Sequence, residues 1–171
     1  KTDRAWTRDF LPIFIKDNKN WNILSNWEFN GWAKYKNFKN DNKAFLEVKK
    51  FKKLKVIKPV YNKKNVVLEG GSIDVNGSGL LLTTKQCLLS KVQQRNKGLK
   101  KWDYHQIFHK FLGIKKIIWL NKGIYGDDTH GHVDDIARFI NKNKIFVATE
   151  KNKKDKNFKN LNENIEIIKK F

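Results

Sequence analysis

The chain has 171 residues, of which 39% are apolar, and its formal net charge is +20. That length suits about one domain with a sizeable core, and the apolar content excludes a disordered tail. The longest apolar runs, at residues 80–82 and 117–120, are far too short to span a bilayer, which excludes a membrane-spanning protein.

Hydrophobic periodicity predicts alternating strands and helices, and therefore an α/β fold. Strands are predicted at residues 11–15, 66–68, 73–75, 80–84, 117–120 and 145–148. Helices are predicted at residues 41–54, 102–112 and 158–168, with Asp41 and Gly113 as caps of the first two. A repeated ββαβ unit suits this order, but periodicity alone does not say how many units form a ring.

The positive charge comes mainly from lysine, since only four of the 37 basic residues are arginine. Nucleic-acid readers favour arginine for bidentate contacts, and the chain has no helix-turn-helix, zinc-finger or ribonucleoprotein motif. We therefore expect no specific nucleic-acid partner, although the charge predicts nonspecific adsorption to polyanions. The single cysteine, Cys87, excludes an internal disulfide and favours a cytoplasmic location.

Two short stretches place acidic residues beside unusual neighbours. Residues 6–12, WTRDFLP, put Trp6 and Asp9 three positions apart just before a strand. Residues 68–72, LEGGS, put Glu69 at a strand end beside two glycines, which allow unusual backbone angles or a close approach. Taken singly, a surface salt bridge with a core tryptophan explains the first stretch at least as well as a binding site, and an ordinary strand-end glutamate explains the second.

A third stretch, residues 126–135 (GDDTHGHVDD), concentrates acids in a chain that has 17 of them. In an extended segment His132 and Asp134 point into one pocket, and Gly131 leaves room beside the imidazole. Two alternatives stay open. The loop could cap a helix at residues 136–140, or its carboxylates could bind a divalent ion with His130 and His132. No HExxH or EF-hand spacing supports a metal site.

Together the three stretches resemble the agmatine deiminases of the bacterial-type peptidylarginine deiminase family. The shared pattern is Trp-x-Arg-Asp-x-x-Pro, Glu-Gly-Gly-Ser and Gly-Asp-Asp-Thr-x-Gly-His-Val-Asp, in that order. Residues 79–89, 112–120 and 136–139 look similar too, so the resemblance covers nearly the whole chain. It implies a pentein fold, an α/β propeller of ββαβ units around a central active site. Residues 1–171 are then a single partial domain, incomplete at both ends.

The resemblance implies a hydrolase that converts agmatine and water to N-carbamoylputrescine and ammonia, without a metal or an organic cofactor. By motif matching, Asp9, Glu69, His132 and Asp134 are catalytic, and Trp6, Asp9, Glu69 and Asp134 bind the substrate. Carboxylates hold a planar guanidinium through paired hydrogen bonds, and an aromatic face attracts the cation. Histidine suits proton transfer because it titrates near neutrality. A homodimer is the assembly that the resemblance suggests.

The match also has gaps. The family's nucleophilic cysteine lies in a later Gly-rich segment ending His-Cys, which does not occur before Phe171. Cys87 matches a different segment, and we expect it to be a small apolar side chain at a helix start. His130 stands where the family usually has aspartate, and Asp135 where asparagine is usual. With no methionine and a start at Lys1, the sequence indicates a fragment. The alternatives are an inactive guanidinium- or polyamine-binding relative, a peptidyl-arginine deiminase and a Lys-rich polyanion-binding module.

Overall fold

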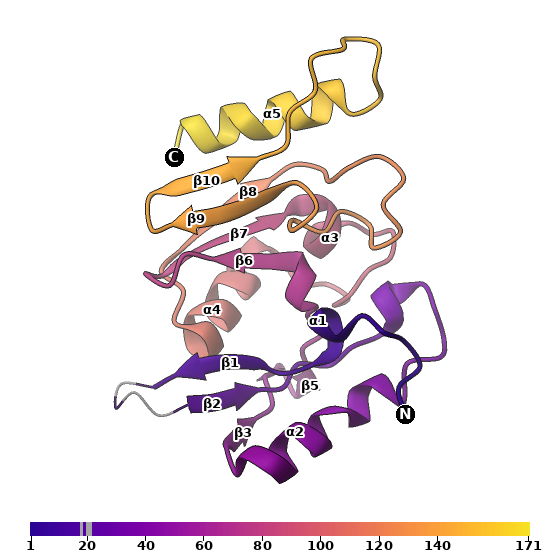
Figure 1. Cartoon of the computed structure of the whole chain (residues 1–171), viewed down its shortest axis with the longest axis vertical. Coiled ribbons are helices and arrows are strands. Elements are labelled where there is room, and N and C mark those ends of the chain that lie inside the picture. Colours follow the sequence, from indigo (N-terminus) through magenta and orange to yellow (C-terminus); the bar gives the residue numbers. More distant parts are fainter. Residues whose placement is uncertain (18, 20–21) are drawn as a thin grey trace. The chain divides into compact units, whose positions relative to one another are not determined.

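Pairs of antiparallel strands, each followed by a helix, recur along the chain (Figure 1). The computed structural model describes residues 1–17, 19 and 22–171, with the side chains of residues 49–52 outside the description. Its contacts divide the chain into two compact units, Lys1–Gly70 and Gly71–Phe171. Within the described ranges, every helix lacks the length and apolar character needed to cross a membrane.

The unit Lys1–Gly70 contains one ββαβ arrangement. The strands β1 (Ile13–Lys16) and β2 (Asn22–Ser25) are antiparallel, and β3 (Lys55–Ile57) joins β2 in parallel after the helix α2 (Phe45–Lys52). The single-turn helix α1 (Thr7–Phe10) precedes this sheet. A small hairpin of β4 (Val60–Tyr61) and β5 (Lys64–Asn65) follows it. Phe10, Phe29 and Trp32 form a buried aromatic cluster in this unit.

The unit Gly71–Phe171 repeats the arrangement. The strands β6 (Ile73–Val75) and β7 (Leu80–Thr84) are antiparallel, and β8 (Lys116–Leu120) lies parallel to β7. The helices α3 (Lys85–Leu89) and α4 (Lys101–Leu112) connect β7 to β8. A second hairpin, β9 (Ala137–Asn141) and β10 (Lys144–Val147), then leads to the helix α5 (Phe158–Lys169).

Amphipathic spacing explains the two long helices of this unit. In α4 the side chains of Tyr104, Ile107 and Phe108 are buried on one face, and Gly113 ends the helix in the left-handed conformation with φ 67°. In α5, Leu161 packs into a core that includes Leu82 and Ile118. The spacing of apolar residues predicts such helices because only one face of each helix is buried.

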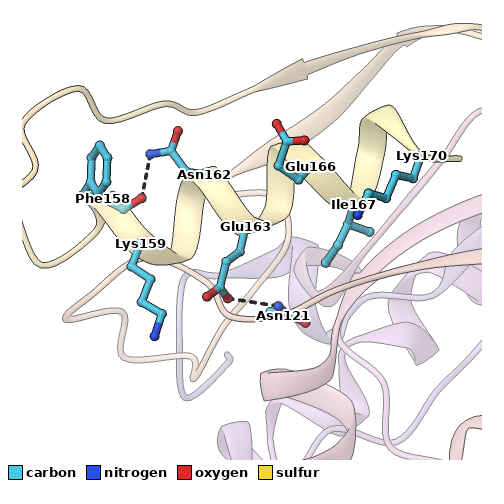
Figure 2. A pocket seen from close by; sticks show the side chains of 8 residues that line it. All are labelled: Asn121, Phe158, Lys159, Asn162, Glu163, Glu166, Ile167 and Lys170. Atoms are coloured by element: carbon cyan, nitrogen blue, oxygen red, sulfur yellow. Dashed lines mark hydrogen bonds between the residues drawn. The ribbon is translucent and has the colours of Figure 1, made fainter.

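Polar side chains fix α5 to the segment after β8. The Asn121 backbone N–H donates to Asn164 Oδ1 (2.8 Å), and the amide of Asn164 donates to the carbonyl of Lys122 (2.7 Å). Figure 2 shows the neighbouring bond from Asn121 Nδ2 to Glu163 Oε2 (3.1 Å). A groove of about 660 Å³ runs along the same helix, lined by Asn121, Phe158, Lys159, Asn162, Glu163, Glu166, Ile167 and Lys170 (Figure 2).

Most of the predicted elements are confirmed within two residues. These are the strands at 11–15, 73–75, 80–84, 117–120 and 145–148, the helices at 102–112 and 158–168, and the glycine cap at residue 113. The ββαβ connectivity is confirmed by the sheet order β1-β2-β3 and by the order β6-β7-β8. Closure of such units into a ring and the single-domain organisation of residues 1–171 stay predictions.

Two predicted elements differ from the structure. The helix expected at 41–54 is divided into a 3-10 turn, Asp41–Lys43, and the shorter α2, and the helix-face residue Phe51 lies outside the described side chains. Asp41 does not cap it, because its carboxylate binds the segment around Arg4 instead. The strand expected at 66–68 reduces to one bridge, in which Val67 pairs with Glu28.

Candidate functional site

The five predicted site residues fall into two groups, one in each unit. Trp6, Asp9 and Glu69 belong to Lys1–Gly70, whereas His132 and Asp134 belong to Gly71–Phe171.

The helix α1 orients Trp6 and Asp9 differently. Trp6 stands at its N-cap with 67% of its surface exposed, and Asp9 is buried at 8% exposure. The indole Nε1–H of Trp32 donates to Asp9 Oδ2 over 3.0 Å. The interpretation of a surface salt bridge with a core tryptophan is therefore wrong for Trp6 and Asp9. The buried tryptophan that contacts Asp9 is Trp32, and Trp6 offers an exposed aromatic face.

Trp32 reaches Asp9 through an unusual backbone. Gly31, Trp32 and Ala33 have φ of 64°, 56° and 53°, all in the left-handed region. The Asn30 side chain accepts the Ala33 N–H (2.8 Å), and the ring of Trp32 packs edge-on against Phe29 at 5.2 Å. A left-handed non-glycine residue costs on the order of 1–3 kcal/mol and persists where its surroundings fix it. Here the surroundings fix Trp32, whose indole N–H donates to Asp9.

A buried ion pair ties the residues before α1 to the rest of the unit. The carboxylate of Asp41, fully buried, accepts the N–H groups of Asp3 (2.7 Å) and Arg4 (3.1 Å) and pairs with the Arg4 guanidinium (3.0 Å). The Arg4 guanidinium also lies over the rings of Trp32 and Tyr35, at 5.2 Å from each centroid. The sequence did not predict this pair, because the residues around Asp41 give no sign that its partner lies 37 positions earlier in the chain.

Glu69 is fully buried and follows a short bridge. The Leu68 N–H donates to the Glu28 carbonyl (3.1 Å), which fixes the backbone just before Glu69. A Cβ on Gly70 would overlap the carbonyl oxygen of Arg8, so only glycine fits at position 70. The expected close approach at these glycines is confirmed, and it sets the segment of Glu69 directly against that of Asp9.

In the second unit, His132 and Asp134 face one another. His132 Nδ1 lies 3.8 Å from Asp134 Oδ1, with the histidine 3% and the aspartate side chain 19% exposed. The Asp134 N–H donates to the carbonyl of Gly71 (3.3 Å) and anchors the segment beside the sheet. The expectation that both side chains share one direction agrees with this geometry. This contact places a carboxylate directly beside the imidazole ring.

Asp127 shapes the loop that carries His132. Its carboxylate accepts the N–H groups of Thr129 (2.7 Å), Gly131 (2.6 Å) and His132 (3.1 Å), and also the Thr129 hydroxyl (2.6 Å). Burial raises the pKa of Asp127, but these hydrogen bonds outweigh it and lower the pKa below its ordinary value of 3.8. Because donors occupy both oxygens, this carboxylate is a poor candidate for the divalent-ion alternative. Sequence reasoning noted the acid-rich loop but missed this residue, although Asp-x-Thr is a turn signal.

Gly131 is required for a reason other than the one expected. Its φ is 94°, and a Cβ there would meet the side chain of Gln86 at 2.9 Å. On its other side, a Cβ on Gly123 would lie 2.6 Å from the Gly131 Cα. The Thr84 hydroxyl donates to the Gly131 carbonyl (2.5 Å). The prediction that Gly131 leaves room for the imidazole is therefore corrected, because the space belongs to Gln86 and Gly123.

The structure also shows where the other residues of the acid-rich loop and the segment after it lie. The alternative of a helix at 136–140 is wrong, since these residues enter β9 and the Phe139 N–H donates to Asp74 Oδ2 (2.6 Å). His130 has φ 65° and places Nε2 at 3.2 Å from Ser90 Oγ. Burial and the charge of Arg95 lower the pKa of His130, against an opposite effect of Asp127. Asp135 is exposed.

Cys87 sits inside the fold at the start of α3. It is fully buried, and its N–H donates to the hydroxyl of Thr84, which caps the helix (3.0 Å). The predicted position at a helix start is confirmed, and the structure shows in addition that the side chain is buried.

Comparison with known proteins assigns the chain to a family. The model of the Porphyromonas-type peptidyl-arginine deiminases matches residues 1–171. The chain belongs to this family. A Legionella pneumophila protein named "Putative agmatine deiminase" is 37% identical over 96% of this chain, and a Listeria monocytogenes protein named "Putative agmatine deiminase 2" is 34% identical over 97%. The chain spans about half the length of these relatives, 46% and 45%.

Solved structures share the fold of this deiminase family member. A Cys-to-Ser variant of C. jejuni agmatine deiminase with substrate bound has a TM-score of 0.85 at 35% identity, over 99% of this chain and 50% of its own. The agmatine deiminase of Enterococcus faecalis has a TM-score of 0.90 at 28% identity, over 100% of this chain and 47% of its own. The chain therefore has the α/β fold of these deiminases.

Proposed function

We propose that the full-length protein is an agmatine deiminase, a hydrolase that converts agmatine and water to N-carbamoylputrescine and ammonia. Support comes from the family, from relatives named for this activity and from the buried carboxylates at the matching motif positions. Homodimer formation, a cytoplasmic location and the lack of a specific nucleic-acid partner are parts of the proposal. It includes no metal and no organic cofactor.

The proposed binding residues suit a planar cation. Asp9, Glu69 and Asp134 supply carboxylates that pair with guanidinium N–H groups. Trp6 supplies an exposed aromatic face, and a cation held over such a face gains about 0.5–2 kcal/mol. The three carboxylates also offset the positive charge of the substrate, which a chain with formal net charge +20 otherwise opposes.

The proposed chemistry needs a nucleophile and a proton carrier. A cysteine thiolate of the later His-Cys segment attacks the guanidinium carbon, and the C–N bond then breaks with loss of ammonia. Water next attacks the resulting amidino-thioether carbon, and the C–S bond breaks to release the carbamoyl product and the thiolate. His132 gives a proton to the leaving ammonia and takes one from the attacking water, so protons balance over one turnover. Asp134 orients the imidazole over the 3.8 Å contact.

Glu69 carries the proposal. Its carboxylate is fully buried, and the glycine at position 70 lets its segment lie against that of Asp9. The proposal assigns the cationic substrate to this carboxylate, because a guanidinium suits a carboxylate that is shielded from water. An ordinary strand-end glutamate needs neither the burial nor the obligatory glycine.

The test uses the full-length protein and measures ammonia and carbamoylated product with agmatine and with a peptide containing arginine. We expect release from agmatine and at least a tenfold rise in KM for Glu69→Gln, since about 1.4 kcal/mol of lost binding is tenfold. Glu166→Gln is the matched control, because Glu166 is an exposed acid on α5. Absence of ammonia with both substrates contradicts the proposal.

Peptidyl-arginine is the second candidate substrate, favoured by the description of the matching family model. Ammonia release from the peptide alone selects it. The same Glu69→Gln comparison then applies, because both substrates present the same guanidinium.

A further inference from the structure

The connection between α3 and α4 holds the loop that carries His132 through contacts that the motifs do not mark. The Gln93 side chain donates from Nε2 to the carbonyl of Asp128 (3.3 Å), and the Arg95 guanidinium donates from Nη2 to the carbonyl of Thr129. Both carbonyls belong to residues that lead directly into the proposed proton carrier. Neither Gln93 nor Arg95 is among the residues to which the proposed function assigns a role.

Arg95 joins the connection to the loop from a buried position. It is only 4% exposed, and a buried guanidinium is costly unless its N–H groups find acceptors. Its second nitrogen, Nη1, donates to the carbonyl of Gln93 (3.0 Å), a residue in the left-handed conformation with φ 45°. The two nitrogens of one rigid fork therefore join carbonyls of two different segments. A lysine, with a single ammonium group on a flexible stem, lacks that fixed geometry.

Thr129 is held by both of its backbone polar groups. Its N–H and its hydroxyl donate to the carboxylate of Asp127, and its carbonyl accepts from Arg95. The two anchors are complementary, since a carboxylate accepts hydrogen bonds and a guanidinium only donates them. Between Thr129 and His132 lie only two residues, both in the left-handed region with φ of 65° and 94°. Because this link is so short, a shift of Thr129 also displaces the imidazole.

We propose that Arg95 is a positioning residue for His132. By fixing the Thr129 carbonyl, its guanidinium keeps the imidazole in the place where Nδ1 lies 3.8 Å from Asp134. Arg95 acts through the loop and not on the substrate, so it is not a catalytic residue. The kinetic consequence rests on the proposed function, in which His132 carries protons during the reaction.

The kinetic test compares Arg95→Lys with the wild type in the full-length protein, well below the melting temperature of each. We expect kcat to fall by about tenfold or more while KM stays within about twofold, because a small misplacement of a catalytic group costs rate rather than binding. Arg95→Gln gives the same comparison without a buried charge. Arg138→Lys is the matched control, because Arg138 is exposed and pairs with Asp74 instead of a loop carbonyl. A wild-type kcat in both Arg95 variants overturns the proposal.

A second readout does not depend on activity. In protein with nitrogen-labelled histidine, the ring resonances of His132 are identified by their loss in His132→Gln. We expect these resonances to shift in Arg95→Lys and Arg95→Gln and to stay unchanged in Arg138→Lys. Unchanged His132 resonances in both Arg95 variants overturn the proposal, whatever the activity. If the wild type releases ammonia from neither agmatine nor the arginine peptide, the proposed function fails, and the resonances alone decide the role of Arg95.

Discussion

At the scale of single residues, Asp127 supports the candidate site although motif matching gave it no role. It accepts the backbone N–H groups of Gly131 and His132, so one carboxylate sets the path of the chain into the catalytic candidate. Trp32 acts in the same way for Asp9 through its indole N–H. Asp9 therefore depends on a residue outside its motif, and His132 on a residue inside its own motif that carries no proposed role.

We expect Asp127→Asn to destabilise the protein by about 1–3 kcal/mol, since an amide cannot accept all these hydrogen bonds. The folded pKa of Asp127 is lowered, so its stabilising effect is fully present above the ordinary value of 3.8 and disappears as pH falls through the folded pKa. Urea unfolding from pH 7 down to pH 2 measures it. The difference in the free energy of unfolding between wild type and variant should narrow below about pH 4. A difference that does not change with pH contradicts the stabilising role of the Asp127 carboxylate.

In the full-length enzyme we expect His132→Ala to lower kcat by about 10²–10⁴-fold while agmatine still binds, because general acid–base catalysis contributes that range. Asp134→Asn and Asp9→Asn should also raise KM, since each removes a charge that holds the cation. Melting temperatures are measured beside the kinetics. If the three residues have only a structural role, each variant should instead lose activity in proportion to its loss of stability.

The motifs revealed the candidate residues, but local sequence did not show their surroundings. Asp9, Glu69 and His132 stand out because acids and histidines are scarce in this lysine-rich chain. The contact between Trp32 and Asp9 was not readable, since the two residues are 23 positions apart in the sequence. The partner of Gly131 was misjudged for the same reason, because Gln86 approaches from another segment.

At the scale of elements, the regular helices and strands were readable and the irregular segments were not. The helices α4 and α5 bury one face at helical spacing, so periodicity predicts them directly. Residues 41–54 have similar spacing, yet Asp41 leaves the helix to bind Arg4 and divides the segment. Tertiary contacts of this kind override local propensity.

Because the Arg4–Asp41 pair is buried, we expect Asp41→Asn to destabilise the protein by about 3–5 kcal/mol, the cost of leaving a buried guanidinium without its counter-charge. The loss should also raise KM, since the pair fixes the segment that leads to Trp6 and Asp9. The matched change Glu166→Gln breaks the exposed Glu166–Lys169 pair and should cost much less, because water and salt screen an exposed pair. Thermal unfolding of both variants measures the difference, and equal losses would contradict the role of burial.

At the scale of the whole molecule, the chain carries acid–base and carboxylate candidates but spans only about half of its relatives. Cys87, its one thiol, is fully buried at the start of α3. It lies outside the His-Cys segment to which the proposal assigns the nucleophile, so the proposal gives it no catalytic role.

We therefore expect the polypeptide 1–171, prepared alone, to release no ammonia from agmatine above background. Covalent catalysis fails without its nucleophile, whatever the binding residues contribute. Ammonia release by the full-length protein is the positive control. Activity in the short polypeptide that disappears on Cys87→Ala would overturn this prediction and the structural role of Cys87.

The obligatory glycine at position 70 has a consequence for the order of folding. Residues 3–9 contact Asp41, Trp32 and Gly70. These three partners are translated long after residues 3–9. Closing such long loops costs entropy before any contact is gained. The segment with Trp6 and Asp9 is thus made before its partners but docks late, once residue 70 has left the ribosome. During that interval Trp32 and Phe29 lack their cover, and a slow step in synthesis between residues 33 and 70 prolongs the exposure of this aromatic cluster to chaperones and to other nascent chains.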